Sequence, residues 1–147
     1  MIWISTDPGG EHVGMAFWED DRLVDCDEYD PLAAMLILDS WEPATLVIEE
    51  FRLYPSKAKT LTGSTMETAQ LIGAMTWWAF QHNAFVYMQP AAIKTPTLAY
   101  ARKHEIQLTT DKGGHAKDAH THGIHYLIRS QGRPTPGSDL FGGGNLQ

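Results

Sequence analysis

The order of strand-like and helix-like segments constrains the fold of this chain more than any other feature. Hydrophobic patterns and turn signals predict strands at 2–7, 12–18 and 23–29, a helix at 31–41, a strand at 45–51, a helix at 64–81, a strand at 84–88, an interrupted helix at 90–104 and a last helix at 114–130. This order is an antiparallel meander followed by alternating helices and strands. It predicts an α/β fold in which a mixed five-stranded sheet, three antiparallel strands plus parallel ones, has helices on both faces.

The length and composition are those of one globular domain. The chain has 147 residues, of which 43% are hydrophobic and 20% charged, enough for a single core. We assign residues 1–131 to this domain and the Gly- and Pro-rich residues 132–147 to a flexible tail. The longest strictly apolar run, 33–38, is far shorter than the roughly 20 residues that cross a bilayer. A start without basic residues and a single cysteine, Cys26, favour the cytoplasm over export.

The charge is distributed unevenly along the chain. The net charge is −7, but residues 1–50 contain 13 acids and one base, whereas residues 51–147 contain 5 acids and 10 bases. Exposed charges more than about 8 Å apart are largely screened at physiological salt, so a basic face can act while acids lie elsewhere. An acidic total therefore does not exclude binding to a polyanion, although scattered solvated charge explains the counts equally well.

Acidic residues stand at the ends of the predicted elements. Asp7 ends the first strand and Glu49 the fourth, while His115 and Asp118 are three residues apart near the start of the last helix and so share a face. The first and fourth strands are neighbours in this topology, and a helix packed across them can present its first turn to both. Two carboxylates about 5 Å apart repel by roughly 3 kcal/mol at an effective dielectric constant near 20. Such a cluster requires a cation or a shared proton, and a divalent metal ion is the simplest occupant.

Each of these residues also has an ordinary structural interpretation. Asp7 before Pro8 suits a turn, and Glu49 suits an exposed strand end. Asp118 and His115 suit the start of a helix, where Asp118 interacts favourably with the helix dipole. The metal site is favoured because all four residues occur together at positions that this order of elements would bring close to one another.

Four short motifs occur in order along the chain. They are Asp7-Pro8-Gly9 with Gly14 seven residues after the aspartate, Val47-Ile48-Glu49, Gln89-Pro90-Ala91-Ala92-Ile93-Lys94, and His115-Ala116-Lys117-Asp118-Ala119. These motifs resemble the first acidic motif, the second acidic strand, the Pro-x-x-Val-Lys stretch and the last motif of RuvC-type Holliday junction resolvases, in the RNase H-like superfamily. With the interior of the long helix, the resemblance spans residues 2–129. The short chain and its Gly-rich tail look more like a bacteriophage member, which would act in the cytoplasm of a bacterial host.

The resemblance implies a metal-dependent endonuclease that hydrolyses phosphodiesters of branched DNA, a Holliday junction or a flap, by a two-metal-ion mechanism. Asp7, Glu49, His115 and Asp118 would bind two divalent ions, Mg²⁺ or Mn²⁺, with Asp7 reaching both, and Lys94 would act on the scissile phosphate. His115 stands where many members have aspartate, and because imidazole suits Mn²⁺ better than Mg²⁺, we expect Mn²⁺ to be favoured. Family members usually act as homodimers, which fits a helix at 64–81 that is apolar nearly all round.

Basic residues around the expected centre are candidate DNA contacts: Arg52, Lys57, Lys59, Lys94, Lys112 and Lys117. Contacts of this kind bind phosphate without reading sequence and weaken with salt, although a solvated loop explains the two lysines at 57 and 59 equally well. The family's stacking aromatic does not align after Glu49 without a one-residue shift, so its assignment to Phe51 or Tyr54 stays open, and we favour a core aromatic for Phe51. We interpret His122 and His125, which share roughly one helical face with His115, as core or solvent-facing histidines.

Other functions remain open at this point. One is an RNase H-like exonuclease or a DNase of broad specificity, although the proofreading type requires Asp-x-Glu on the first strand and position 9 is glycine. Another is a non-catalytic module that binds junctions through a degenerate site. The sugar-kinase and actin-like ATPases share Asp-x-Gly after the first strand, but they need a duplicated domain for which 147 residues leave no room.

Overall fold

The computed structural model describes residues 1–52 and 63–131, so that Lys57, Lys59 and the predicted tail at 132–147 lie outside the described residues. A five-stranded sheet in the order β3-β2-β1-β4-β5 forms the centre. Its strands are β1 (Ile2–Pro8), β2 (Val13–Glu19), β3 (Arg22–Tyr29), β4 (Thr45–Glu49) and β5 (Phe85–Gln89). The predicted α/β fold with a mixed sheet is confirmed.

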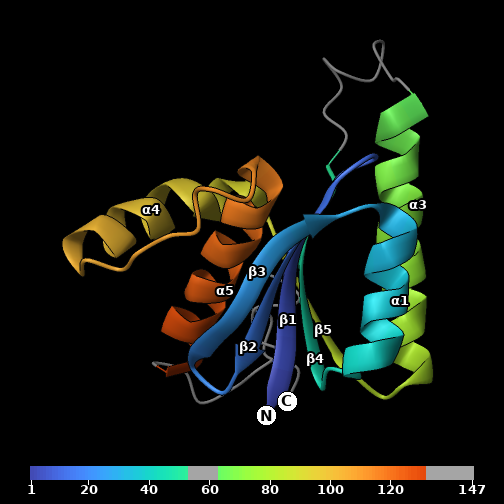
Figure 1. Ribbon diagram of the computed structural model, residues 1–147, viewed down its shortest axis with the longest axis horizontal. Coiled ribbons are helices and arrows are strands. Elements are labelled where there is room, and N and C mark those ends of the chain that lie inside the picture. The colour runs from blue at the N-terminus through green and yellow to red at the C-terminus, as the bar shows by residue number, and fades with distance from the viewer. Residues whose placement is uncertain (53–62, 132–147) are drawn as a thin grey trace, which may run out of the picture.

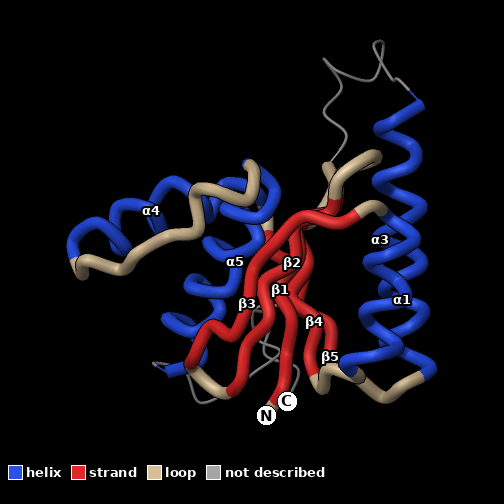
Figure 2. Tube along the Cα trace, in the orientation of Figure 1, coloured by secondary structure: helices blue, strands red, loops and turns tan. Residues whose placement is uncertain are grey.

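Helices cover both faces of this sheet. They are α1 (Pro31–Trp41), α3 (Gly63–Gln81), α4 (Lys94–Lys103), which follows the short 3₁₀ helix η1 (Ala91–Ile93), and α5 (Gly114–Gln131). Figure 1 and Figure 2 show α1 and α3 against one face and α5, with α4 beside it, against the other. The interruption predicted near Lys94 is the junction between η1 and α4.

The ends of α1 illustrate how the sequence sets an element. The Asp30 side chain accepts a hydrogen bond from the backbone N–H of Ala33 at 3.0 Å, and Pro31 occupies the first helical position. The helix ends at Trp41, and the next residue, Glu42, has a φ of 46°, in the left-handed region. These signals are local, which is why the predicted bounds of α1 agree with the structure.

The strand register brings the ends of three strands to one edge of the sheet. β1 and β2 pair antiparallel, with Asp7 opposite Gly14. β1 pairs in parallel with β4, and β4 with β5, where Glu49 lies opposite Gln89. Because β1, β4 and β5 run in the same direction, their carboxyl ends meet at one edge, where α/β folds commonly place ligands. The predicted adjacency of the first and fourth strands is therefore confirmed.

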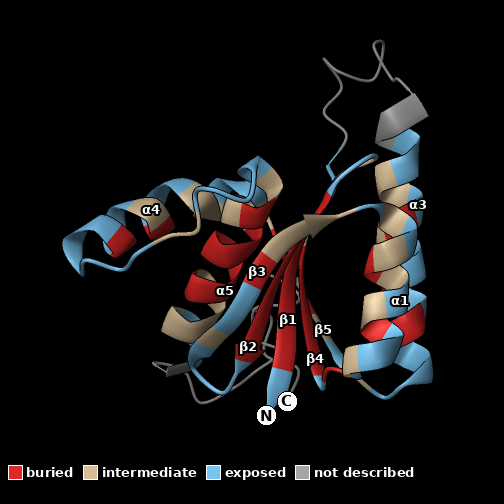
Figure 3. Cartoon of the chain, viewed as in Figure 1, coloured by how far each residue is buried: buried red, intermediate tan, exposed pale blue. Residues whose placement is uncertain are grey.

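Alternation along the strands creates two separate cores. The core beneath α1 and α3 contains Ile4, Met15, Phe17, Leu46, Ile48, Leu38, Met75 and Trp78. The core beneath α5 contains Trp3, Ala16, Trp18, Val47, Tyr87, Ala116, Ala119 and Ile124, and the rings of Trp3 and Trp18 stack with centroids 4.8 Å apart. Figure 3 shows the buried strands between these two helical layers. Successive strand residues therefore point toward different helices, as the two-residue period of a strand requires.

Two glycines let α5 approach the sheet closely. A Cβ atom at Gly14 would lie 1.9 Å from the carbonyl oxygen of His115, and one at Gly123 would lie 2.2 Å from the ring of Trp18. Neither position has room for a side chain, so the start and the middle of α5 rest directly on β2. Within residues 1–52 and 63–131, no helix combines the length and the apolar character needed to cross a membrane.

Candidate metal centre

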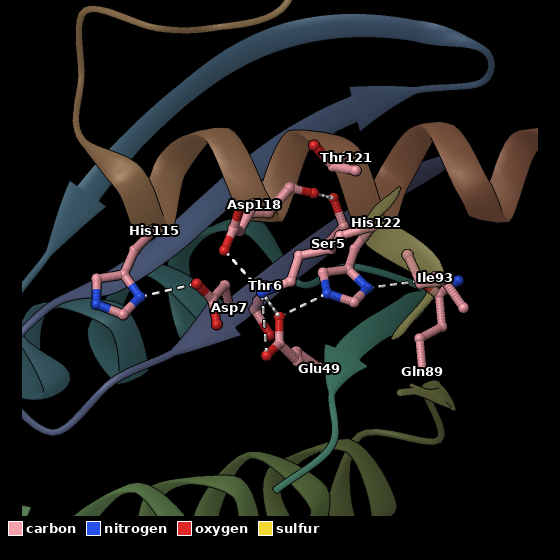
Figure 4. Close-up of polar contacts among 12 residues, drawn as sticks. Ser5, Thr6, Asp7, Glu49, Gln89, Ile93, His115, Asp118, Thr121 and His122 are labelled. Atoms are coloured by element: carbon pink, nitrogen blue, oxygen red, sulfur yellow. Dashed lines mark hydrogen bonds and ion pairs between the residues drawn. The ribbon is translucent and has the colours of Figure 1, made fainter. Parts of the chain in front are cut away.

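Three carboxylates from three elements converge at the edge where the parallel strands end. Asp7 and Glu49 point to the α5 face of the sheet, and Asp118 faces them from the first turns of α5 (Figure 4). One carboxylate oxygen from each of the three lies within 4.8 Å of the others, and Asp7 is buried. This spacing suits oxygen ligands around a common divalent ion. The structure thus brings together residues that are 42 and 69 positions apart in the chain.

The start of α5 is fixed by a carboxylate from the edge strand. Glu28 on β3 accepts a hydrogen bond from the backbone N–H of His115 at 2.8 Å, an interaction favoured at a helix N-terminus. Gly113, just before the helix, has φ 109°, a value that L side chains rarely adopt. Together with the close contact at Gly14, these features set the position from which α5 presents Asp118.

His115 lies beside Asp7. Its Nδ1 atom is 2.8 Å from Oδ2 of Asp7, and its side chain is less buried than that of the aspartate. Burial, and then the nearby negative charge of Glu49, raise the pKa of Asp7 to about 6, although His115 opposes the rise. The structure therefore places His115 in contact with one carboxylate of the cluster. Among the described residues, the group whose ligand atoms all lie within 4.8 Å of one another consists of the three acids and does not include His115.

Lys94 at the start of α4 bridges two of the three acids. Its Nζ atom is 2.8 Å from Oδ2 of Asp118 and 3.1 Å from Oε2 of Glu49. Burial lowers the pKa of Lys94, but the hydrogen bonds to Asp118 and Glu49 outweigh burial and raise it above its ordinary value. The ammonium group partly neutralises a cluster that would otherwise carry uncompensated negative charge.

His122 and Gln89 are the site residues that the sequence interpretation missed. His122 is fully buried on α5, as expected of a core histidine, but its Nε2 atom is 2.7 Å from Oε2 of Glu49 and its Nδ1 atom is 2.8 Å from Oε1 of Gln89 (Figure 4). Burial raises the pKa of Glu49, but the contacts with His122 and Lys94 outweigh it and lower the pKa below its ordinary value. A spacing of four residues between Asp118 and His122 was the available signal, because it places both on one helical face.

The candidate DNA-binding residues have different surroundings. Arg52 pairs with Glu50, and Nζ of Lys112 lies 3.7 Å from Oδ2 of Asp27. Lys117 lies next to Asp118 on α5 and is half-buried. Arg52, Lys112 and Lys117 are therefore arranged near the carboxyl edge of the sheet or the start of α5.

The interpretation of Phe51 as a core aromatic was wrong. β4 ends at Glu49, two residues earlier, so Phe51 lies beyond the sheet, and 37% of its surface is exposed. Further along α5, His125 contacts Thr97 of α4, with 3.3 Å between Nδ1 and Oγ1. His125 thus belongs to the packing between α4 and α5.

Solved structures of Holliday junction resolvases resemble this one in fold. The structure of Thermus thermophilus RuvC in complex with a Holliday junction substrate matches with a TM-score of 0.67 and 16% identity over 89% of this chain and 96% of that chain. Another Thermus thermophilus RuvC structure gives 0.64 and 15% over the same shares. The Fowlpox virus resolvase, in complex with its substrate Holliday junction DNA, gives 0.54 and 12% over 88% of this chain and 100% of that chain. The chain has their RNase H-like fold. A scan against known protein families finds no match, and no curated protein matches the sequence.

Proposed function

We propose that this chain is a divalent-metal-dependent endonuclease that hydrolyses phosphodiesters of branched DNA, a Holliday junction or a flap. One observation carries the proposal: Asp7, Glu49 and Asp118 come from three different elements and place carboxylate oxygens within 4.8 Å of one another. They do so on a fold shared with two resolvases whose structures contain Holliday junction DNA. The fold alone does not define an activity, so the proposal depends on this cluster.

The donor set fits divalent cations. Three carboxylates so close together repel one another, and burial and the neighbouring charge of Glu49 raise the pKa of Asp7. Oxygen ligands suit Mg²⁺ and Mn²⁺, and the imidazole of His115 beside Asp7 would add a nitrogen ligand. In this proposal Asp7, Glu49, His115 and Asp118 would hold two divalent ions.

Each residue then has a defined task. Two divalent ions in such a site supply an activated water and stabilise the leaving oxygen of an in-line displacement. Asp7, Glu49 and Asp118 would hold the ions. The ammonium group of Lys94 lies close enough to Glu49 and Asp118 to contact a phosphate bound beside these acids. Arg52, Lys57, Lys59, Lys112 and Lys117 are proposed to bind the DNA backbone around this point, with the salt dependence that phosphate contacts have.

The choice of metal ion follows from His115. Imidazole suits Mn²⁺ better than Mg²⁺, so we expect faster cleavage in Mn²⁺, and replacement of His115 by aspartate should reduce the difference between the two ions. Cleavage that is equal or faster in Mg²⁺ would contradict the role of His115 as a ligand.

We also propose that the chain acts as a homodimer through α3. Met66, Trp77 and Phe80 on this helix expose 53%, 59% and 72% of their surfaces, and the rings of Trp77 and Phe80 stack with centroids 5.4 Å apart. Large exposed apolar side chains on one helix mark an interaction surface, and a second copy of the chain would bring two sites to the two strands of a junction. A cytoplasmic location, in a bacterial host if the chain is encoded by a phage, agrees with the buried free thiol of Cys26.

The decisive experiment is a cleavage panel on four-way, flap, single-stranded and duplex DNA with Mn²⁺ and with Mg²⁺. The wild-type chain should cut the branched substrates, and Asp7→Asn should abolish cleavage while junction binding persists. Asp21→Asn, an exposed acid in the turn between β2 and β3, is the matched control and should cut normally. No cleavage by the wild type in Mn²⁺ would favour a non-catalytic junction-binding module. Equal cutting of unbranched DNA would favour an exonuclease or a DNase of broad specificity.

A further inference from the structure

A fully buried histidine lies on the face of α5 that points to the candidate metal centre. His122 is four residues after Asp118, so the two side chains lie one above the other on the helix, and none of the His122 surface is exposed. A buried polar ring is costly unless both of its nitrogens have partners. The partners of His122 are side chains from the ends of β4 and β5, so the ring lies between α5 and the edge of the sheet where the acids meet.

The ring contacts one oxygen of the Glu49 carboxylate from the side opposite the other acids. Nε2 of His122 is 2.7 Å from Oε2 of Glu49, and Figure 4 shows Glu49 between His122 on one side and the Asp7 and Asp118 side chains on the other. The side chain of Glu49 is 16% exposed, so water does not replace this contact freely. A glutamate at the last position of a strand has several rotamers, and this contact selects one of them.

Gln89 fixes the ring of His122. It lies opposite Glu49 in the register of β4 and β5, is buried, and has its amide 2.8 Å from Nδ1 of His122. With the amide oxygen toward Nδ1, both ring nitrogens carry protons; with the amide turned over, its NH₂ group donates to Nδ1 of a neutral ring. In both arrangements Nε2 of His122 donates to the ionised carboxylate of Glu49.

Lys94 cannot perform the same task once a cation is bound. Its ammonium lies between Glu49 and Asp118, within the group of acids that would hold the cation, and like charges repel at this distance. His122 instead contacts Oε2 of Glu49 from α5, and Gln89 holds the ring in that position. A cation bound through Oε1 of Glu49 therefore leaves the contact between His122 and Oε2 in place.

We propose that His122 and Gln89 are positioning residues that hold the Glu49 carboxylate in the orientation that binds a divalent cation. The proposal rests on the proposed function, because it assumes that Glu49 is a metal ligand. Hydrogen-bond partners of metal ligands change metal affinity by about 10- to 100-fold when they are removed. A histidine that merely fills the core would affect stability without this effect.

Binding of Mn²⁺ alone, measured by calorimetry, tests the proposal independently of cleavage. His122→Leu should weaken Mn²⁺ binding by about 10- to 100-fold and Gln89→Leu by about 10-fold or less, with junction affinity in EDTA unchanged. His122→Gln, whose amide NH₂ can replace Nε2 as a donor, should recover most of the Mn²⁺ affinity. Recovery by this variant is not expected if His122 acts by filling space.

His120→Leu is the matched control. His120 lies two residues away on α5 and is also buried, but its Nδ1 accepts a hydrogen bond from the backbone N–H of Thr109 rather than contacting an acid. This variant should lower thermal stability and leave Mn²⁺ binding within about two-fold of the wild type. If His122→Leu does not fold, His122→Gln and Gln89→Leu decide the matter.

The outcomes separate the two proposals. A wild-type chain that binds Mn²⁺ and cuts junctions, with His122→Leu and Gln89→Leu binding Mn²⁺ as tightly, overturns the positioning role and leaves the nuclease standing. A wild-type chain that binds Mn²⁺ but never cuts DNA overturns the nuclease, while loss of affinity in His122→Leu and recovery in His122→Gln still support the positioning role. Absence of Mn²⁺ binding by the wild type overturns both.

Discussion

The two faces of the sheet are built from the same strands but bury different chemistry. On the α1 and α3 face, side chains such as Ile4, Met15 and Leu46 form an apolar core. On the α5 face, the polar residues Ser5, Asp7, Gln89, His120 and His122 are also buried, next to a second apolar core. Burial of polar groups is unfavourable unless they are hydrogen-bonded, and among the described residues every buried side-chain nitrogen or oxygen has a partner.

The difference shows how one small domain separates stability from chemistry. The α1 and α3 face requires mainly apolar side chains of suitable volume, which many sequences supply. The α5 face requires particular partners at particular distances, because one unpaired buried group costs about 1–3 kcal/mol. Substitutions on the first face should therefore change stability alone, and substitutions of the residues on the second face that contact the acids should change metal binding as well.

The largest effect is expected where α5 touches β2. Gly14→Ala places a Cβ atom 1.9 Å from the carbonyl oxygen of His115, and because backbone cannot move aside as a side chain can, we expect a loss of about 4 kcal/mol in the free energy of unfolding, above the usual cost of overpacking. Displacement of α5 also moves Asp118, so Mn²⁺ binding should be lost. Denaturant unfolding and calorimetry measure the two effects.

Gly114, at the start of α5, provides the control for Gly14 on β2. A Cβ atom at Gly114 meets nothing within 4 Å, so Gly114→Ala should leave stability within about 0.5 kcal/mol of the wild type. If Gly14→Ala were equally harmless, the close packing of α5 on β2 would be incorrect.

Met75→Ala addresses the apolar face. Met75 on α3 is fully buried among apolar side chains, and truncation of a buried methionine costs about 2–5 kcal/mol, so we expect a loss of about 3 kcal/mol. The three acids are on the other side of the sheet, and Mn²⁺ affinity of the folded variant should match the wild type. A large loss of affinity would show that the two faces are not independent.

The sequence predicted the order of the elements and the grouping of the acids better than the contacts between the site residues. The strands and α1 follow from local patterns such as Asp30-Pro31. Asp7, Glu49 and Asp118 were identified because each acid stands at the end or the start of a predicted element, and the order of those elements brings them to one place. The contact between His122 and Glu49 depends on how α5 is rotated over the sheet, which tertiary packing decides.

Phe51 is a second residue whose surroundings could not be predicted from the local sequence. Its apolar side chain and its position after a buried strand favoured burial, but the strand ends at Glu49, and Phe51 is exposed. Element ends are the least certain part of a sequence-based assignment. Here the strand ends two residues earlier than predicted, and this difference places Phe51 at the surface instead of in the core. No pattern in the sequence distinguishes Thr45-Leu46-Val47-Ile48-Glu49 as the whole strand.

Asp7→Asn should stabilise the metal-free chain at neutral pH. The pKa of Asp7 is raised to about 6 by burial and by Glu49, so between about pH 4 and pH 6 the folded chain binds a proton that the unfolded chain has released. Stability therefore falls as pH rises through this window, by on the order of 2 kcal/mol, and asparagine removes the loss. Thermal unfolding in EDTA at about pH 4 and pH 7 measures the effect.

The sign of this change should reverse with Mn²⁺. A cation that binds only the folded wild type stabilises it by mass action, and Asp7→Asn forgoes that gain. At about pH 4, well below the raised pKa of Asp7 and near the ordinary pKa of an unfolded aspartate, most of the loss is absent, so the two chains should unfold at similar temperatures. A variant that is less stable than the wild type at neutral pH in EDTA would contradict the cause assigned to the pKa of Asp7.

The smallest effect on stability is expected on the outer surface of α3. Trp77→Ser should change the free energy of unfolding of the chain by less than about 0.5 kcal/mol, because Trp77 is 59% exposed. If α3 joins two copies, however, the substitution should convert a dimer into a monomer in light scattering coupled to size-exclusion chromatography. Val24→Ser on the edge strand β3, also an exposed apolar residue, is the control and should remain a dimer. A wild-type chain that is monomeric, or a Trp77 variant that stays dimeric, would refute α3 as the dimer interface. The outer surface of α3 would then have no role in assembly, and the α1 and α3 side of the sheet would contribute to stability alone.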